Sequence, residues 1–162
     1  NAGSSSLKGF ELDMNFRIGA GFNVFANAGI AKTRYDDFVT GTADYSGNRF
    51  QFAPEKTAAA GLSYDQGIGY RASVIQSYTG DVYLDNDNRQ QLPAYSLTNI
   101  RLGYAATDWK VEAYVNNVFD RRAKSYAYDY SDYTPAPSFV LSGDYENWVP
   151  DPSAGVVAQY DF

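Results

Sequence analysis

The sequence A-G-V-V-A-Q-Y-D-F at residues 154–162 decides the fold class. As an extended strand it places one set of side chains on each face: Val156, Ala158, Tyr160 and Phe162 on one, and Gly155, Val157, Gln159 and Asp161 on the other. Successive side chains of a strand point to opposite sides, so the first face is apolar and the second more polar. About nine to eleven residues let a tilted strand cross a bilayer. The stretch therefore predicts an amphipathic strand, either of a membrane barrel or of an ordinary sheet.

The composition restricts the possible functions. The 162 residues include no cysteine and no histidine, and the net charge is -6. Absence of histidine excludes triad hydrolysis, histidine-zinc sites and haem ligation by histidine. The negative charge argues against a nucleic-acid surface. No run approaches 18 apolar residues, so no transmembrane helix is predicted. The 15 Tyr and 10 Phe, with few helix signals, favour an all-β protein with tyrosine-bearing loops.

Six earlier stretches also alternate between apolar and polar residues. They run from about residue 10 to 18, from 22, from 54 to 64, from 70, from 98 to 104 and from 109 to 116. Short turns and long loops connect them in strict alternation, with long loops at about 34–53, 79–93 and 120–153. Membrane barrels have this arrangement, with tight turns on the periplasmic side and long loops outside.

Large apolar or aromatic residues flank every predicted short turn. The flanking pairs are Ile18 and Phe22, Tyr64 and Tyr70, and Tyr104 and Trp109, with Tyr160 and Phe162 at the same level. Amphipathic rings gathered at one end of a set of strands are typical of the aromatic girdle at a membrane interface. This pattern favours the membrane barrel.

Seven strands cannot close an up-and-down barrel of a single bacterial chain, which needs an even number. Either residues 138–145 hide a further strand, or the chain is the C-terminal part of a larger barrel. The start N-A-G-S-S-S lacks the features of a secretion signal, which favours the second interpretation.

Several motifs resemble those of the TonB-dependent outer-membrane transporters. They are G-F-E-L at 9–12, P-E-K at 54–56, Y-S-L-T-N-I-R-L-G-Y at 95–104, Trp109, and V-N-N-V-F-D at 115–120. The N-N-x-F-D ending is the most specific of them. One departure is P-S-A-G at 152–155, where the family often has an arginine after the proline.

The resemblance implies an all-β, antiparallel, up-and-down transmembrane β-barrel segment. Residues 1–162 would supply about seven of 22 strands, as the C-terminal portion of a barrel whose plug and earlier strands are not in this sequence. The implied function is import of a scarce nutrient, an iron chelate or siderophore first, across the bacterial cell outer membrane. The implied partners are outer-membrane lipid, the plug and remaining strands, the TonB complex acting through the plug, the barrel-assembly machinery and a small-molecule ligand. No enzyme activity, cofactor or nucleic-acid partner is expected.

Three groups of residues are candidates for function. The ligand-contact candidates in the long loops are Tyr83, Tyr126, Tyr128, Tyr130, Tyr133 and Trp148. Their rings offer large contact areas, although loop tyrosines also pack on one another. The polar residues expected to face the lumen are Asn99, Arg101, Lys110 and Glu112, and the closing strand and assembly signal comprise Val156, Ala158, Tyr160 and Phe162. The D-N-D-N run at 85–88 favours a solvated turn over a calcium site, and no metal site is predicted.

Two alternatives remain open at this point. A soluble, aromatic-rich β-sandwich that binds carbohydrate would bury its alternating residues against a second sheet. A small self-contained barrel with an adhesin or structural role would need an eighth strand.

Overall fold

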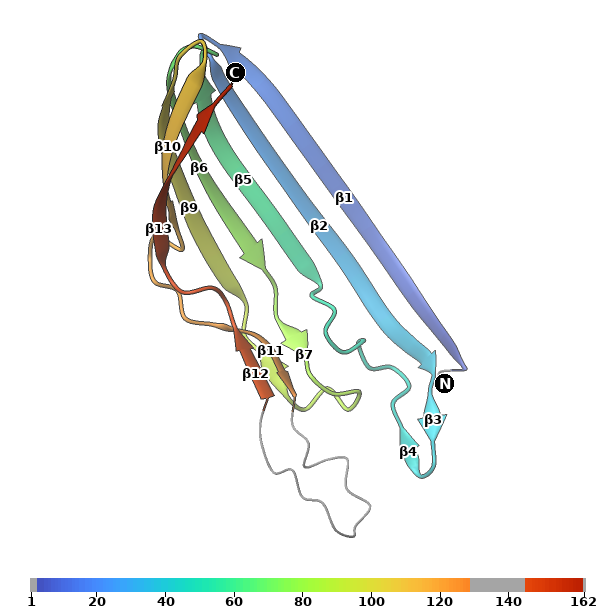
Figure 1. Cartoon of the computed structure of the whole chain (residues 1–162). Helices are drawn as coiled ribbons and strands as arrows, with labels where there is room; N and C mark the ends of the chain where they lie inside the picture. The colour runs from blue at the N-terminus through green and yellow to red at the C-terminus, as the bar shows by residue number, and fades with distance from the viewer. Residues whose placement is uncertain (1–2, 129–144, 162) are drawn as a thin grey trace.

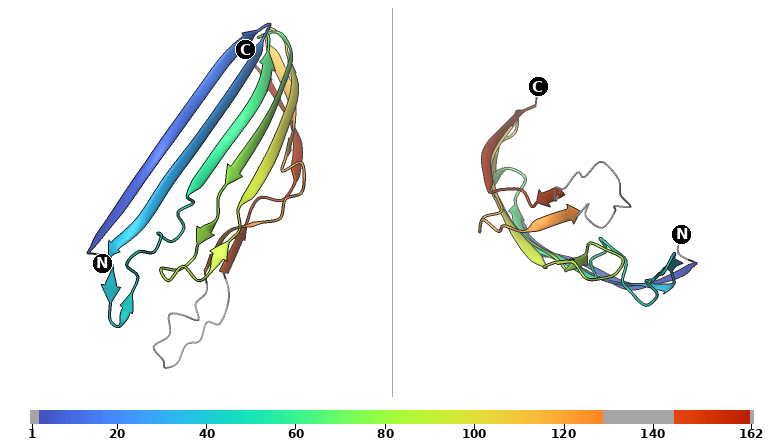
Figure 2. Two further views of the ribbon diagram at one scale, coloured as in Figure 1. Left: turned by 180° about the vertical axis from the view of Figure 1, so that it is seen from behind. Right: turned by 90° about the horizontal axis from the view of Figure 1, so that it is seen from below.

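Seven strands form one antiparallel sheet in the computed structural model, which describes residues 3–128 and 145–161 (Figure 1). The strands, in the order of the sheet, are β1 (Ser4–Gly19), β2 (Phe22–Asp37), β5 (Lys56–Asp65), β6 (Gly69–Thr79), β9 (Tyr95–Ala105), β10 (Trp109–Asn116) and β13 (Ser153–Tyr160). Each strand pairs with the next of these along the chain, so the topology is up-and-down. The sheet curves into an open arc whose edges are β1 and β13 (Figure 2).

Three small hairpins lie at the end of the sheet where the long connections run (Figure 1). They pair β3 (Val39–Thr40) with β4 (Ala43–Asp44), β7 (Val82–Tyr83) with β8 (Gln91–Leu92), and β11 (Lys124–Tyr128) with β12 (Tyr145–Trp148). We call this end the long-loop end and the opposite end the short-turn end. The sequence pattern identified none of the hairpins, because strands of a few residues are too short to show a period.

The first two strands are longer than their apolar alternation predicts. The expectation that a loop begins at about residue 34 is wrong, since β2 continues to Asp37 and pairs there with the start of β1. Side chains in this part are polar on both faces, which hides the period, but backbone pairing does not require an apolar face.

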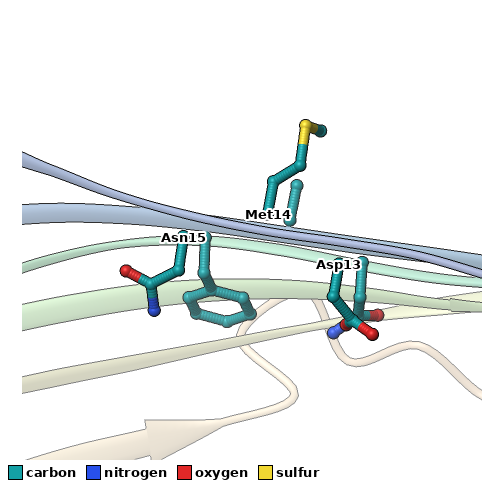
Figure 3. Close-up of a pocket in the computed structure, with 6 residues that line it drawn as sticks. Asp13, Met14 and Asn15 are labelled. Carbon is teal, nitrogen blue, oxygen red and sulfur yellow. The ribbon is translucent and has the colours of Figure 1, made fainter.

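The register between neighbouring strands pairs apolar residues with apolar residues, so that they share one face of the sheet. One row of directly paired residues is Phe16, Val24, Leu62, Val74, Ile100, Val115 and Ala154. The neighbouring row, on the other face, is Arg17, Asn23, Ser63, Ser73, Arg101, Tyr114 and Gly155. We call these the apolar face and the polar face. Figure 3 shows Met14 on the opposite side of the sheet from Asp13 and Asn15, which point to the concave side where the later strands lie.

The apolar face has no second sheet against it in the described part of the chain. Phe10, Ile18 and Val156 are 67%, 68% and 69% exposed, and none of the described large side chains is fully buried. A soluble sandwich would bury this face against a second sheet, and the described residues show no such interface. Within the same ranges, no helix is long and apolar enough to cross a membrane.

Aromatic rings contact one another along the short-turn end. The ring centroids of Phe22 and Tyr64 are 4.7 Å apart, those of Tyr70 and Tyr104 are 5.3 Å apart, and Tyr104 lies 5.8 Å from Trp109. Trp109 pairs in register with Tyr160 on β13. The rings expected to flank the short turns therefore form an aromatic band on the apolar face, made of two groups of contacting rings.

Two glycines on the polar face are covered by rings from the adjacent strand. A Cβ atom at Gly61 would lie 2.4 Å from Phe25 Cε1, and one at Gly155 would lie 2.6 Å from the Tyr114 hydroxyl oxygen. Each ring therefore occupies the space beside a position where only glycine leaves room.

Adjacent alanines on opposite faces give a direct test of the membrane-facing side. Ala60 pairs with Ala26 on the apolar face, and Ala59 pairs with Asn27 on the polar face. We expect Ala60→Arg in the full-length protein to lose most of its folded, heat-modifiable form, because arginine near the bilayer midplane costs about 2–4 kcal/mol. Ala59→Arg is the matched control and should assemble in near-normal amounts. Equal assembly of both variants would contradict the face assignment.

Candidate functional site

An aromatic cluster fixes the first long loop at the long-loop end. The Tyr35 ring centroid lies 4.7 Å from those of both Phe38 and Phe50, and Phe38 lies 5.2 Å from Tyr45. The backbone also pairs here, since the Tyr35 amide donates to the Asn48 carbonyl and the Gly47 amide donates to the Tyr35 carbonyl. The part of the loop around residues 45–50 therefore folds back onto β2, whereas the β3–β4 hairpin projects beyond the end of the sheet (Figure 1).

Arg49 joins this first loop to the second. Its Nη1 atom lies 2.9 Å from Asp81 Oδ2, and its guanidinium carbon lies 5.0 Å from the Tyr83 ring centroid. Asp81 Oδ2 also accepts a 2.6 Å hydrogen bond from Gln91 Nε2. The hydrogen bond from Arg49 holds the pKa of the Asp81 carboxyl below its ordinary value, and the Gln91 amide adds to the effect. Because both partners are partly shielded from water, this pair is a stronger constraint than a fully exposed one.

The D-N-D-N segment is used to build the same junction. The Asn88 side chain accepts a hydrogen bond from the Arg49 amide at 2.7 Å and donates one to the Arg49 carbonyl at 3.0 Å. Tyr35 donates its hydroxyl hydrogen to Asn86 Oδ1 at 3.0 Å, and the Asp85 carboxylate accepts from the amides of Arg89 and Gln90. These oxygens serve loop structure, and the described residues contain no group of three or more acidic, histidine or cysteine side chains arranged for a metal.

The third long loop is held by its own hairpin and by one ring contact. Lys124 pairs with Glu146, and its Nζ lies 5.6 Å from the Trp148 ring centroid. The Tyr126 ring stacks on Phe52 with centroids 4.8 Å apart and an interplanar angle of 25°. Since the Phe52 amide donates to the Tyr83 carbonyl, position 52 links all three long loops.

The structure thus brings two of the ligand-contact candidates together. Both contact Phe52, Tyr83 through its backbone carbonyl and Tyr126 through its ring. Trp148 lies beside Lys124 with 53% of its surface exposed. Tyr128 belongs to β11, and its side chain is outside the described structure. Tyr130 and Tyr133 lie outside the described residues.

Sequence reasoning missed the residues that organise these loops, namely Arg49, Phe52 and Asp81. The only available signal was the cation between aromatic residues in N-R-F-Q-F at 48–52. An arginine in that setting is a candidate for stacking and for pairing with a carboxylate. Its partner, Asp81, could not be identified, because the contact joins two loops.

The predicted lumen residues lie together on the polar face. Arg101 donates to Glu112 Oε1 at 2.8 Å, and its guanidinium lies 5.8 Å from the Tyr114 ring centroid. Asn99 Oδ1 accepts a 3.0 Å hydrogen bond from the Asn117 amide, which ties the end of β10 to β9. Lys110 pairs in register with Gln159 on β13.

The closing-strand residues lie on the apolar face. Val156, Ala158 and Tyr160 pair with Ala113, Val111 and Trp109 on β10. Phe162 lies outside the described residues. The proposed roles in ligand contact, lumen lining and assembly remain predictions.

Sequence relatives of this chain are bacterial receptors. It is 29% identical over 132 residues to the pesticin receptor of Yersinia pestis, covering 79% of this chain and 19% of that protein. The pesticin receptor of Yersinia enterocolitica is 28% identical over 132 residues, with 79% and 19% covered. The chain therefore spans about a fifth of the length of these relatives.

Solved structures of three receptors share the fold. The ferric yersiniabactin uptake receptor FyuA from Yersinia pestis superimposes with a TM-score of 0.79 at 24% identity, covering 100% of this chain and 24% of that one. The siderophore receptor PiuA from Acinetobacter baumannii gives 0.74 at 21% identity, covering 95% and 21%. The ferripyoverdine receptor of Pseudomonas aeruginosa gives 0.66 at 18% identity, covering 98% and 20%.

A family match settles the classification. Residues 1–118 match the family described as TonB dependent receptor-like, beta-barrel. This match confirms the resemblance inferred from the sequence motifs, the antiparallel barrel fold and the bacterial outer membrane as location. The chain belongs to the TonB-dependent receptor-like β-barrel family, which consists of outer-membrane receptors and not of enzymes.

Proposed function

We propose that this chain is the C-terminal part of a receptor that imports a ferric siderophore across the outer membrane. The observation that carries the proposal is the interlocked loop cluster around Arg49, Phe52 and Asp81, which gives one end of the sheet a defined, ring-bearing surface. Preorganised aromatic loops suit a large, flat ligand, because rigid rings contribute contact area at low entropic cost. The siderophore and pesticin receptors among the relatives support the substrate class.

The open sheet supports the assignment to a larger barrel. β1 and β13 each leave one edge without a neighbouring strand in the described structure. Unpaired backbone groups cost several kcal/mol each in hydrocarbon, so strands outside this chain would complete the sheet. The polar face, with its Arg101–Glu112 pair, would then line a lumen and face the plug. Coupling to the TonB complex would act through that plug, and the barrel-assembly machinery would recognise the closing strand with Val156, Ala158, Tyr160 and Phe162.

Uptake measurements test the substrate class. Cells that lack the receptor gene and cells that carry the full-length gene are given radiolabelled iron as ferric yersiniabactin or ferripyoverdine. We expect receptor-dependent uptake of at least one chelate, abolished when the energy-coupling complex is deleted. Labelled cobalamin and a maltooligosaccharide are tested in parallel. Receptor-dependent uptake of either, without any uptake of ferric chelate, would replace the siderophore assignment.

The two tryptophans offer a matched test of loop contact. Trp148 is exposed in the loop cluster, whereas Trp109 belongs to the aromatic band at the short-turn end. We expect Trp148→Ala to weaken binding of the transported ferric chelate about threefold to tenfold, as loss of one aromatic contact does. Trp109→Ala should leave the affinity of correctly assembled receptor unchanged. Equal affinities of both variants and the wild type would remove Trp148 from the binding surface.

Acid should loosen the junction of the first two loops. Because the folded state lowers the pKa of Asp81, its contribution to stability is present above the ordinary carboxyl pKa and is lost as the pH falls through the lowered value. Hydrogen exchange of residues 80–92 should therefore be slower at pH 5 than expected from the intrinsic rates, and this protection should be lost on acidification below the ordinary carboxyl pKa. Asp81→Asn should lack the protection already at pH 5. Asp87→Asn is the control, because the Asp87 carboxylate lies 3.5 Å from the largely exposed Arg89. Equal protection of residues 80–92 in the two variants would contradict the prediction.

A further inference from the structure

Four basic side chains follow the apolar face at the point where its apolar residues end. Lys8 comes two residues before Phe10 on β1, Lys32 two residues after Ile30 on β2, and Lys56 two residues before Ala58 on β5. Alternation along each strand places these lysines on the same face as their apolar neighbours. Arg34 lies one step farther along β2, opposite Ser6. We call Lys8, Lys32, Arg34 and Lys56 the basic rim.

The side chains of the basic rim form no ion pair in the described structure, although the carboxylates of Asp36 and Glu55 lie in the same pocket. Lys8 and Lys32 are directly paired across β1 and β2, an arrangement that is destabilising for like charges. All four side chains are exposed, and within the described residues none of them forms an ion pair. The nearby Asp36 carboxylate accepts a hydrogen bond from the Ser6 hydroxyl at 3.1 Å. The described ion pairs therefore include none that would offset the repulsion between Lys8 and Lys32.

An open pocket of about 450 Å³ lies among these side chains. Lys8, Lys32 and Arg34 line it, together with Ser6, Asp36 and Glu55. The pocket is large enough for a phosphate group with part of a sugar, and its hydroxyl and cationic donors match phosphate oxygens.

The position of the basic rim relative to the bilayer indicates which kind of anion can reach it. From Ile18 to Phe10 the apolar positions of β1 cover roughly 27 Å of strand at about 3.4 Å per residue, or some 20–22 Å across a bilayer at the usual tilt. The rim therefore lies at the headgroup level on the long-loop side, in direct continuity with the lipid-facing surface. Clusters of lysine and arginine at that level attract anionic lipid phosphates.

We propose that the basic rim binds the phosphate groups of a lipopolysaccharide molecule in the outer leaflet. The inference requires only that the apolar face meets lipid and the long loops lie outside the cell. It is independent of which ligand the receptor transports. Binding would neutralise the Lys8–Lys32 pair and fix a lipid beside the first long loop.

Lipid binding by the purified full-length receptor tests the proposal. The probes are lipopolysaccharide in detergent, the same lipid after enzymatic removal of its phosphates, and inorganic phosphate as competitor. The wild type should bind the phosphorylated lipid at least about tenfold more tightly than the dephosphorylated one, because each lysine or arginine beside an anionic lipid contributes about 1 kcal/mol of binding free energy. Equal affinity for the two lipids would overturn the proposal, and this comparison needs no variant. Complete competition by millimolar inorganic phosphate would indicate a general anion site and would also overturn it.

Variants locate the contact. Lys8→Gln/Lys32→Gln/Lys56→Gln should lower lipopolysaccharide affinity at least about tenfold, whereas Lys8→Arg/Lys32→Arg/Lys56→Arg should retain it. Lys110→Gln, which removes a cation from the polar face, is the matched control. Unchanged binding by the glutamine variant would overturn the assignment to the basic rim. The basic-rim variants should transport ferric chelate like the wild type, so a failure here and a failure of the proposed transport function are distinguishable.

Discussion

The structure depends on the antiparallel register of its seven long strands, which runs continuously through the middle of the sheet and shifts near the two ends of the β1–β2 pair. Because side chains alternate with a period of two, a slip of one residue at any interface would move every later strand's apolar set to the polar face. The paired row from Phe16 to Ala154 shows that no such slip occurs. This constraint alone produces a sheet that meets lipid on one side and a polar interior on the other. It also places the aromatic band at the short-turn end of the apolar face and the basic rim toward the long-loop end of the same face.

The two faces are packed by different means. Within the described residues the apolar face has no second sheet against it, and large residues such as Phe10 and Val156 are exposed, as expected for side chains that face lipid in a membrane barrel. On the polar face, rings instead cover glycines of the next strand, as Phe25 does over Gly61 and Tyr114 over Gly155. The Arg101–Glu112 pair supplies this face with charge.

The sequence was sufficient for the parts of the fold that repeat. Alternation identified all seven long strands, and the flanking rings identified the short turns, because both signals recur with a fixed period. The long loops carry no period. The junction of Arg49 with Asp81 spans 32 positions, and the stack of Phe52 on Tyr126 spans still more, so neither contact has a local signature. Of the predicted aromatic residues, Tyr83, Tyr126 and Trp148 lie in short hairpin strands within the long connections, and their role in ligand contact stays a prediction. The residues that hold those connections together were found only in three dimensions.

One consequence follows from how the aromatic band is staggered across the sheet. The band moves along the strands by about one residue per strand, from Phe22 and Tyr64 to Trp109 and Tyr160, which corresponds to a lean of roughly 35°. At that lean, the part of β1 beyond Phe10 rises roughly 16 Å above the hydrocarbon. The first two strands thus extend beyond the membrane and hold the first long loop above it. A solute diffusing toward the cell therefore meets the loops before it reaches the lipid surface.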